Sequence, residues 1–185
     1  MQLAGTDIRL LRVFDAVVRH RGFAAAQAEL NVGASTISAP IAALEDRLGV
    51  TLCRRGRAGF RLTQRGEQVH RAIERLLAAM DGFVSETAAL RDTLAGTLRI
   101  GVVDSVVTDP NFRLYEALAT LEKRSSAIRF EIAQTSPQEL QTRVLEGVLP
   151  LGIGSFPHKV AGLRYTPLYE ERNTLYCARG HRLWS

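Results

Sequence analysis

The spacing of apolar positions divides the chain into three parts. Through residue 48 apolar residues recur every three or four positions, in segments that predict three helices. The first opens at Asp7, after a Thr6 cap, and ends at the Arg21–Gly22 break. The second covers 23–30 and the third 34–48, and the turn at 31–33 between them has the length that joins crossed helices. This pattern predicts a tri-helical, helix-turn-helix head.

The third predicted helix has two different faces. One carries apolar residues at steps of four, three and four, which predicts burial: Ile37, Ile41, Leu44 and Leu48. The other carries only small side chains: Ser35, Thr36, Ser38, Ala39 and Ala42. Small hydroxyl and methyl groups let a helix enter the major groove and approach base edges closely. The same small residues would also suit a helix–helix contact.

A short hairpin is predicted after the third helix. Residues 51–53 and 60–62 can pair, and Gly56 and Gly59 make the tip permissive. Arginines without any acid lie in and around this hairpin: Arg54, Arg55, Arg57, Arg61 and Arg65. Such a wing can bind phosphates or the narrow minor groove. A solvated hairpin is the alternative, but its position beside the small-residue helix favours DNA.

Residues 66–95 contain no proline and repeat apolar side chains with heptad spacing. The repeat is Val69, Ile73, Leu76, Met80, Phe83, Thr87, Leu90 and Leu94, at alternating steps of four and three. A seam sustained over more than three heptads predicts a long dimerisation helix that pairs with a second copy. The alternative is an amphipathic helix packed on its own domain.

The remainder, 96–185, predicts a partial α/β domain. Strand-like runs at 98–103, 128–133 and 149–154 alternate with helical patterns, which favours a parallel sheet. One helix is expected to start at Asp109–Pro110 and another at the capping box Ser136 to Glu139. Further strands are expected at 163–169 and 174–178.

Polar residues follow the predicted strands at their carboxyl ends, where ligands bind in parallel sheets. They are Asp104, Ser105, Thr135, Ser136, Gly154 and Ser155. Hydroxyls and helix N-termini at these points suit a small anion such as a carboxylate. Ordinary capping and turn chemistry is the alternative for each residue.

Charge and composition narrow the function. The net charge is +5, and all of the excess lies in residues 1–65, where ten arginines face five acids. A basic module on a neutral remainder favours a polyanionic partner, most commonly nucleic acid. Cys53 and Cys177 are far apart, and the four histidines are scattered. We therefore expect no disulfide, metal, cofactor or catalytic activity. Without a long apolar or secretory segment, we expect a cytoplasmic protein and no membrane partner.

Residues 8–65 resemble the DNA-binding domain of LysR-type transcriptional regulators. Four matches at fixed spacing carry the resemblance: Gly22–Ala26, the serines and Ile-x-x-Leu-Glu between Ser35 and Glu45, Leu48–Leu52, and Leu62–Gly66. The resemblance implies three parts: a winged helix-turn-helix head (1–65), a linker helix (66–95) and a partial periplasmic-binding-protein-like effector domain (96–185). It also implies DNA contacts from Ala34, Ser35, Thr36, Ser38, Ala39 and the wing arginines, and effector contacts from Ser105, Thr135 and Ser136.

Three departures from the family pattern change the expectations. Ala39–Pro40 stands where polar residues usually follow the second serine. A proline inside a helix costs about 3 kcal/mol unless a kink absorbs it, so we expect a bent third helix and more dependence on DNA shape. Cys53 replaces the usual Phe and is expected to be a small core residue. Pro150 stands where the family commonly has Asp.

The resemblance implies a regulator that binds pseudo-palindromic double-stranded DNA as a homodimer, or as a tetramer built from dimers, and responds to a small-molecule effector. Family members usually continue into a second α/β subdomain, so we expect this chain to be a fragment with an incomplete sensor. Two other interpretations stay open. One is an architectural DNA-binding protein of low specificity, and the other is a small-molecule-binding domain whose head has no role in DNA binding.

Overall fold

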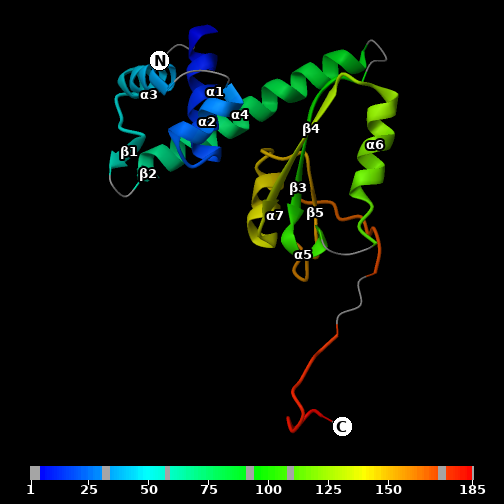
Figure 1. Cartoon of the computed structure of the whole chain (residues 1–185). Helices are drawn as coiled ribbons and strands as arrows, with labels where there is room; N and C mark the ends of the chain where they lie inside the picture. Colours follow the sequence, from blue (N-terminus) through cyan, green and yellow to red (C-terminus); the bar gives the residue numbers. More distant parts are fainter. Residues whose placement is uncertain are drawn as a thin grey trace.

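The computed structural model describes residues 5–30, 34–56, 59–90, 94–107, 111–170 and 174–184 (Figure 1). A helical head (residues 5–62) is joined by the long helix α4 to an α/β unit (residues 96–170), and the last described segment extends away from the sheet. Among the described residues, none of the helices combines the length and the apolar character that crossing a bilayer requires.

Three helices form the head, as the periodicity predicted: α1 (Gly5–Arg19), α2 (Phe23–Leu30) and α3 (Ala34–Leu48). Phe14 from α1 is fully buried against the apolar stripe of α3. Ile37, Ile41 and Leu44 are at most 1% exposed, so their predicted burial is confirmed, whereas Leu48 is half-buried. The predicted turn at 31–33 and the Thr6 side chain lie outside the described residues.

A two-stranded antiparallel hairpin follows, formed by β1 (Cys53–Gly56) and β2 (Gly59–Leu62). Cys53 lies opposite Leu62 and is 9% exposed in the head's core, which confirms its predicted role as a small core residue. The wing is therefore a continuation of the head and not a separate loop.

Helix α4 runs from Gln64 to Ala89, after the N-cap Thr63. It is shorter than the predicted 66–95 segment, and Leu94 lies beyond its end, so Leu94 cannot continue the helical seam. Ile73, a residue of the predicted dimer seam, is 4% exposed and belongs to the head's core together with Leu77. Its assignment to a dimer contact is corrected, because the head of the same chain already covers this side of α4.

The α/β unit is built on a parallel sheet, as predicted. Its strand order is β4-β3-β5, with β3 (Gly96–Val103) between β4 (Ile128–Thr135) and β5 (Leu151–Ile153). Helices α6 (Leu114–Arg124) and α7 (Pro137–Leu145) cover opposite faces, and the short α5 (Asp104–Val107) follows β3 (Figure 1). The two faces of the sheet therefore have separate apolar clusters.

Helix α7 approaches the sheet very closely. Gly101 of β3 lies opposite Gly152 of β5 in the parallel register. A Cβ atom at Gly101 would lie 2.1 Å from Leu140 Cδ1, and one at Gly152 would lie 2.7 Å from Leu140 Cγ. Only glycine leaves room for the Leu140 side chain, which is fully buried at this point.

Two expectations for the C-terminal part are wrong. Segments 163–169 and 174–178 form no strand. Strands need a backbone partner, and 163–169 instead packs beside α7, where the Tyr165 hydroxyl accepts a hydrogen bond from Gln141 Nε2 at 2.8 Å. The predicted start at Asp109–Pro110 lies outside the described residues, and α6 begins at Leu114.

Gly66 and Gly82 provide a matched test of packing within α4. A Cβ at Gly66 would lie 1.9 Å from the Leu52 carbonyl oxygen, whereas one at Gly82 would meet nothing within 4 Å. We expect Gly66→Ala to lower the free energy of unfolding by about 3 kcal/mol, because backbone must move. Gly82→Ala should raise it by about 0.5–1 kcal/mol through higher helix propensity. Urea unfolding followed by circular dichroism measures both, and equal effects would contradict the close contact.

Candidate nucleic-acid interface

The outer face of α3 carries the small side chains that the sequence indicated. Thr36 and Ala39 are exposed and Ser38 is half-buried. The side chains of Ala34 and Ser35 lie outside the described residues. Ala42, on the same face, is exposed as well. The described part of this face therefore presents small hydroxyl and methyl groups to solvent, which allow close approach to base edges.

Pro40 lies inside α3, which continues through it as one helix. Its side chain is buried, at helical spacing from Ile37, Ile41 and Leu44 on the core side. Because proline has no N–H, the carbonyl of Thr36 receives no hydrogen bond from residue 40. Pro40 therefore contributes packing to the head and supplies no side chain to the outer face.

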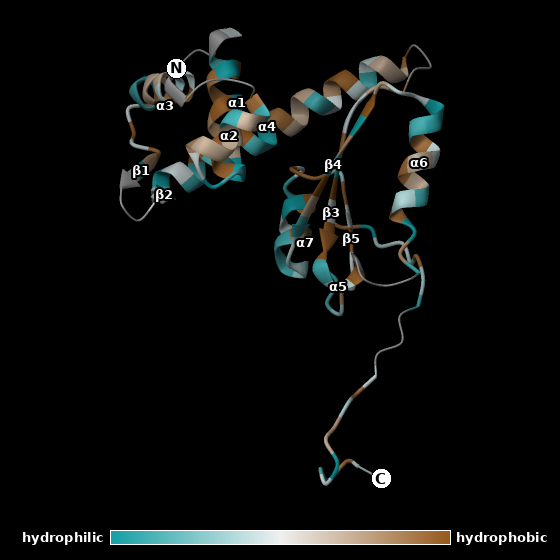
Figure 2. Ribbon diagram, in the orientation of Figure 1, coloured by the Kyte–Doolittle hydropathy of each residue, from teal (hydrophilic) through white to brown (hydrophobic). Residues whose placement is uncertain are grey.

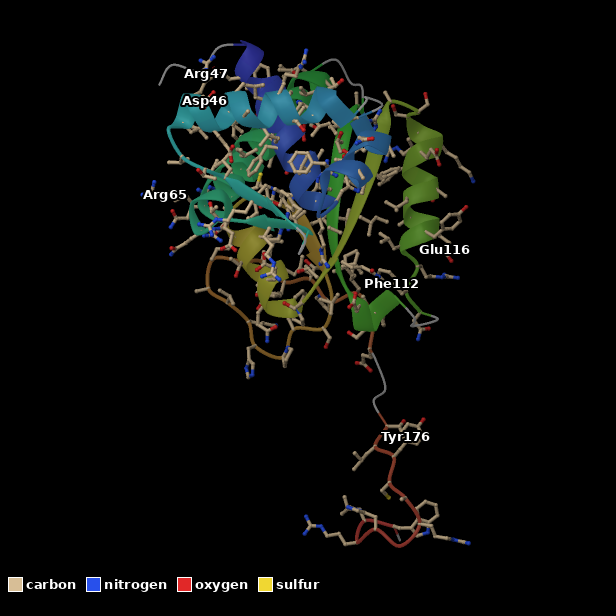
Figure 3. All side chains as sticks on the ribbon, turned by 60° about the vertical axis from the view of Figure 1, so that its left-hand side comes forward. Asp46, Arg47, Arg65, Phe112, Glu116 and Tyr176 are labelled. Carbon is tan, nitrogen blue, oxygen red and sulfur yellow. The ribbon has the colours of Figure 1, made fainter. Side chains whose placement is uncertain are left out.

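Two arginines of the hairpin lie directly opposite each other. Arg54 of β1 is the cross-strand partner of Arg61 of β2, and both side chains are exposed. Opposed like charges destabilise a hairpin, so this pair favours a ligand that supplies negative charge. Arg65, in the first turn of α4, projects from the outer edge of the head (Figure 3). The side chain of Arg55 and all of Arg57 lie outside the described residues.

No ion pair among the described residues involves Arg54, Arg61 or Arg65. Two other head arginines are neutralised internally. Arg47 binds Asp7 at 2.9 Å, and Arg19 binds both Asp15 at 2.9 Å and Glu29 at 2.6 Å. The uncompensated positive charge of these described arginines is therefore on the wing and at the start of α4.

The pKa values of the acids around Arg19 reflect these pairs. Burial alone would raise the pKa of Asp15, but hydrogen bonds from His70 and Arg19 hold it below its ordinary value. Burial likewise opposes ionisation of Glu29, and Arg19 and His20 lower its pKa. Both carboxylates are therefore charged at neutral pH, and both form ion pairs with Arg19.

The wing is held against α3 by a residue that the sequence analysis did not single out. Glu45 Oε1 accepts hydrogen bonds from the backbone N–H groups of Leu52 at 2.6 Å and Cys53 at 3.2 Å. At the same open end of the hairpin, the Thr63 hydroxyl donates to the Thr51 carbonyl at 2.7 Å and accepts from Gly66 N at 2.9 Å. The signal was present in the Leu-Glu and Leu-Thr-x-x-Gly motifs, which place these residues.

The predicted effector residues lie at the carboxyl ends of two neighbouring strands. Thr135 ends β4 opposite Val103 of β3, Ser105 follows in α5, and Ser136 caps α7. The Ser136 hydroxyl accepts a hydrogen bond from Glu139 N at 3.3 Å, which confirms Ser136 as the N-cap of α7. This bond also means that Ser136 already has a structural role.

A cavity of about 890 Å³ lies beside these strand ends. It is bounded by α7, β5 and segment 162–169, with Gly154, Ser155, Tyr165 and Tyr169 in its lining. Ser105, Thr135 and Ser136 are not among its lining residues. Tyr165 was missed because 163–169 was expected to be a strand, whereas this segment packs beside α7 through the Tyr165 hydroxyl.

The apolar surface of α4 changes along its length. Val69, Leu76 and Met80 are half-buried and pack against the head, as part of the core that contains Ile73. Farther along, Phe83 is 68% exposed, Val84 50% and Leu90 86%. Figure 2 shows hydrophobic residues continuing along the part of α4 that leaves the head. Only this second half offers a large uncovered apolar surface.

The chain matches the sequence patterns of two protein families. Residues 8–67 match the bacterial regulatory helix-turn-helix protein, lysR family, and residues 91–185 match the LysR substrate binding domain. The chain is 43% identical over 183 residues to the HTH-type transcriptional activator BauR of Pseudomonas aeruginosa, covering 99% of this chain and 60% of BauR. It is 32% identical over 173 residues to a probable hydrogen peroxide-inducible genes activator of Mycobacterium xenopi, covering 94% of this chain and 90% of that protein.

Solved structures are similar in fold. Full-length OxyR from Pseudomonas aeruginosa aligns with a TM-score of 0.56 and 23% identity over 83% of this chain and 52% of that one. A Corynebacterium glutamicum OxyR mutant aligns with a TM-score of 0.55 and 22% identity over 84% and 48%. The chain spans 60% of the length of BauR and about half the length of the two OxyR chains.

The wing arginines should control the salt dependence of DNA binding. We expect Arg54→Ala, Arg61→Ala and Arg65→Ala each to weaken binding to any duplex and to reduce the slope of log K against log salt by about 1. Arg113→Ala is the matched control, since that side chain is 81% exposed on the distant α/β unit. Titrations by fluorescence anisotropy at several salt concentrations measure the slope, and an equal effect of the control would argue against the wing.

Proposed function

This chain belongs to the LysR family of bacterial helix-turn-helix regulators, and on that basis we propose that it is a sequence-specific transcriptional regulator. It binds a pseudo-palindromic promoter site as a homodimer and responds to a small-molecule effector, with no catalytic role. A regulator of this kind would act in the cytoplasm, where it binds chromosomal DNA. The proposed parts are a DNA-binding domain at 1–65, a linker at 66–95 that contains most of α4, and an effector-binding region at 96–185.

The observation that carries the proposal is the position of Arg54 and Arg61. Two like charges face each other across a hairpin that Glu45 fixes to α3, and the exposed Thr36 and Ala39 lie on that helix. In this arrangement α3 enters the major groove while the wing binds the phosphates beside it. Ala34, Ser35, Ser38, Arg55, Arg57 and Arg65 complete the proposed DNA-binding set.

The second half of α4 supports a dimer. Phe83 and Leu90 are large apolar side chains that the chain itself leaves largely uncovered, and Val69, Leu76 and Met80 extend the stripe toward the head. Pairing this stripe with its counterpart would bury it and place two heads on successive turns of DNA. Dimers could associate further into tetramers.

We also propose that the effector is a small anion bound near Ser105, Thr135 and Ser136. Adjacent ends of β3 and β4 bring these hydroxyls to one edge of the sheet, beside the first turn of α7. Backbone N–H groups and hydroxyls at such an edge favour a carboxylate.

Sequence preference distinguishes a sequence-specific regulator from an architectural DNA-binding protein. Pro40 favours the architectural alternative, because it stands where the family usually has a residue that contacts bases. Footprinting on the DNA that flanks the protein's own coding region should reveal a protected site. The chain should bind this site about 1,000-fold more tightly than a scrambled duplex of equal composition. Thr36→Ala should lose roughly five- to 150-fold of that preference, as expected for one lost base contact. Equal affinity for both duplexes, with the same salt slope, would support the architectural alternative.

A charge placed on the uncovered half of α4 should prevent pairing. We expect Phe83→Glu to raise the dimer dissociation constant about tenfold or more while leaving the head folded, because Phe83 is 68% exposed in the single chain. Arg71→Ser, an exposed substitution outside the apolar stripe, is the control. Analytical ultracentrifugation measures the dissociation constant. A dimer that tolerates Phe83→Glu as well as Arg71→Ser would assign the interface elsewhere.

A further inference from the structure

A continuous run of charged side chains connects the α/β unit to the head through α4. Arg143 of α7 donates a hydrogen bond to Glu74 Oε1 at 2.5 Å. The other oxygen of Glu74 lies 3.7 Å from His70 Nδ1, one turn earlier on α4. His70 Nε2 lies 3.1 Å from Asp15 Oδ1 on α1, and Asp15 also binds Arg19. Three elements from different parts of the chain therefore share one set of ion pairs.

This set is largely removed from water. The side chains of Asp15, His70 and Glu74 are 11%, 12% and 13% exposed. The edge of the Phe14 ring packs against His70, with the ring centroids 6.0 Å apart. Because solvent screens such charges poorly, each carboxylate depends on its cationic partners. A carboxylate that loses one of these partners must interact more strongly with those that remain.

His70, Asp15 and Glu74 have the composition of a metal site, and their ligand atoms lie within 4.8 Å of one another. The geometry favours ion pairing instead. His70 directs its two ring nitrogens at two different carboxylates, and a single metal ion could bind only one of these nitrogens. The second oxygen of each carboxylate binds an arginine, so each acid already has a cationic partner.

Two further ion pairs join α4 to the α/β unit. Arg99 of β3 binds Asp81 at 2.8 Å, and Arg75 lies 3.7 Å from Glu146. A cavity of about 400 Å³ lies between the head, α4 and the sheet. Ion pairs beside an unfilled cavity hold two units together less tightly than a closely packed apolar interface does. The α/β unit, with α7, can therefore change position relative to α4. Figure 1 shows α7 on the side of the sheet that faces the head.

We propose that Glu74 and His70 are positioning residues that transmit the position of α7 to the DNA-binding head. While Arg143 shares Glu74, His70 stays with Asp15 and holds α1 on α4. When α7 moves away, Glu74 loses Arg143 and keeps His70 as its remaining partner in this set. The ring then moves toward Glu74 and away from Asp15, and the orientation of the head on α4 becomes less defined.

The inference rests on the proposed function, because a dimer must present two heads at a fixed separation. A poorly oriented head should weaken binding to paired half-sites and leave binding to a single half-site unchanged. Arg143→Gln, His70→Gln and the double variant form a cycle that measures whether the two side chains act through each other. Arg75→Gln is the matched control, since Arg75 joins α4 to the same unit without contacting His70.

We expect R143Q and H70Q each to weaken paired-site binding about tenfold, and the double variant to be no weaker than the stronger single variant. R75Q should change affinity less than twofold, with or without H70Q. E74Q, which keeps the shape of Glu74, should have the same affinity for paired half-sites as the double variant. It tests the same connection without changing His70, so a folding defect in H70Q cannot account for the result. Equal weakening by R143Q in the wild-type and H70Q backgrounds would overturn the proposal.

Amide hydrogen exchange without DNA provides an independent readout. R143Q should speed exchange in α1, where Asp15 lies, and R75Q should not. If R143Q speeds exchange only within the α/β unit, Arg143 has a local structural role and the proposal is wrong. If wild-type protein fails to prefer paired half-sites while α1 responds as expected, the proposed dimeric function fails and the connection between α7 and α1 stands.

Discussion

The burial of Ile73 and Leu77 in the core of the head is the contact on which the rest of the arrangement depends. Each buried side chain of this size contributes about 1.5–3 kcal/mol, enough to make the first half of α4 an integral part of the head. The start of α4 then fixes the wing, through Thr63 and the close approach of Gly66 to Leu52. It also carries His70 and Glu74 to the junction with the α/β unit.

Electrostatics divides the head into an inner and an outer set of charges. Arg19 and Arg47 neutralise carboxylates within the head and stabilise its packing. Arg54 and Arg61 oppose each other on the wing, where a polyanion would relieve their repulsion. Arg54 and Arg61, together with Arg65, therefore present part of the excess positive charge of the first 65 residues on the wing, which Glu45 joins to α3, and at the start of α4.

Local patterns were sufficient for much of the fold. Helical periodicity predicted α1 to α3, and short β-branched runs predicted the three parallel strands, because both signals lie within a few neighbouring residues. The heptad spacing of α4 could not distinguish burial against the chain's own head from burial against a second copy, since both need the same stripe; Ile73 was misassigned for this reason. Segment 163–169 was misjudged because an apolar run becomes a strand only where a neighbour offers backbone groups.

The candidate site shows the same limit. The residue types of the wing and of α3 followed from sequence. The contacts of Glu45 with the wing, of Arg143 with Glu74 and of His70 with Asp15 join positions 7 to 69 residues apart. Such pairs depend on how whole elements pack, which no local period encodes.

The glycine pair under Leu140 has a mechanical consequence. With Gly101 and Gly152 admitting the Leu140 side chain into the surface of the sheet, α7 cannot slide or roll over the strands without a steric clash. The sheet and α7 must therefore move together as one rigid body. Any tilt of the strands therefore also moves Arg143, which lies on the flank of α7 three residues after Leu140 and binds Glu74 of α4.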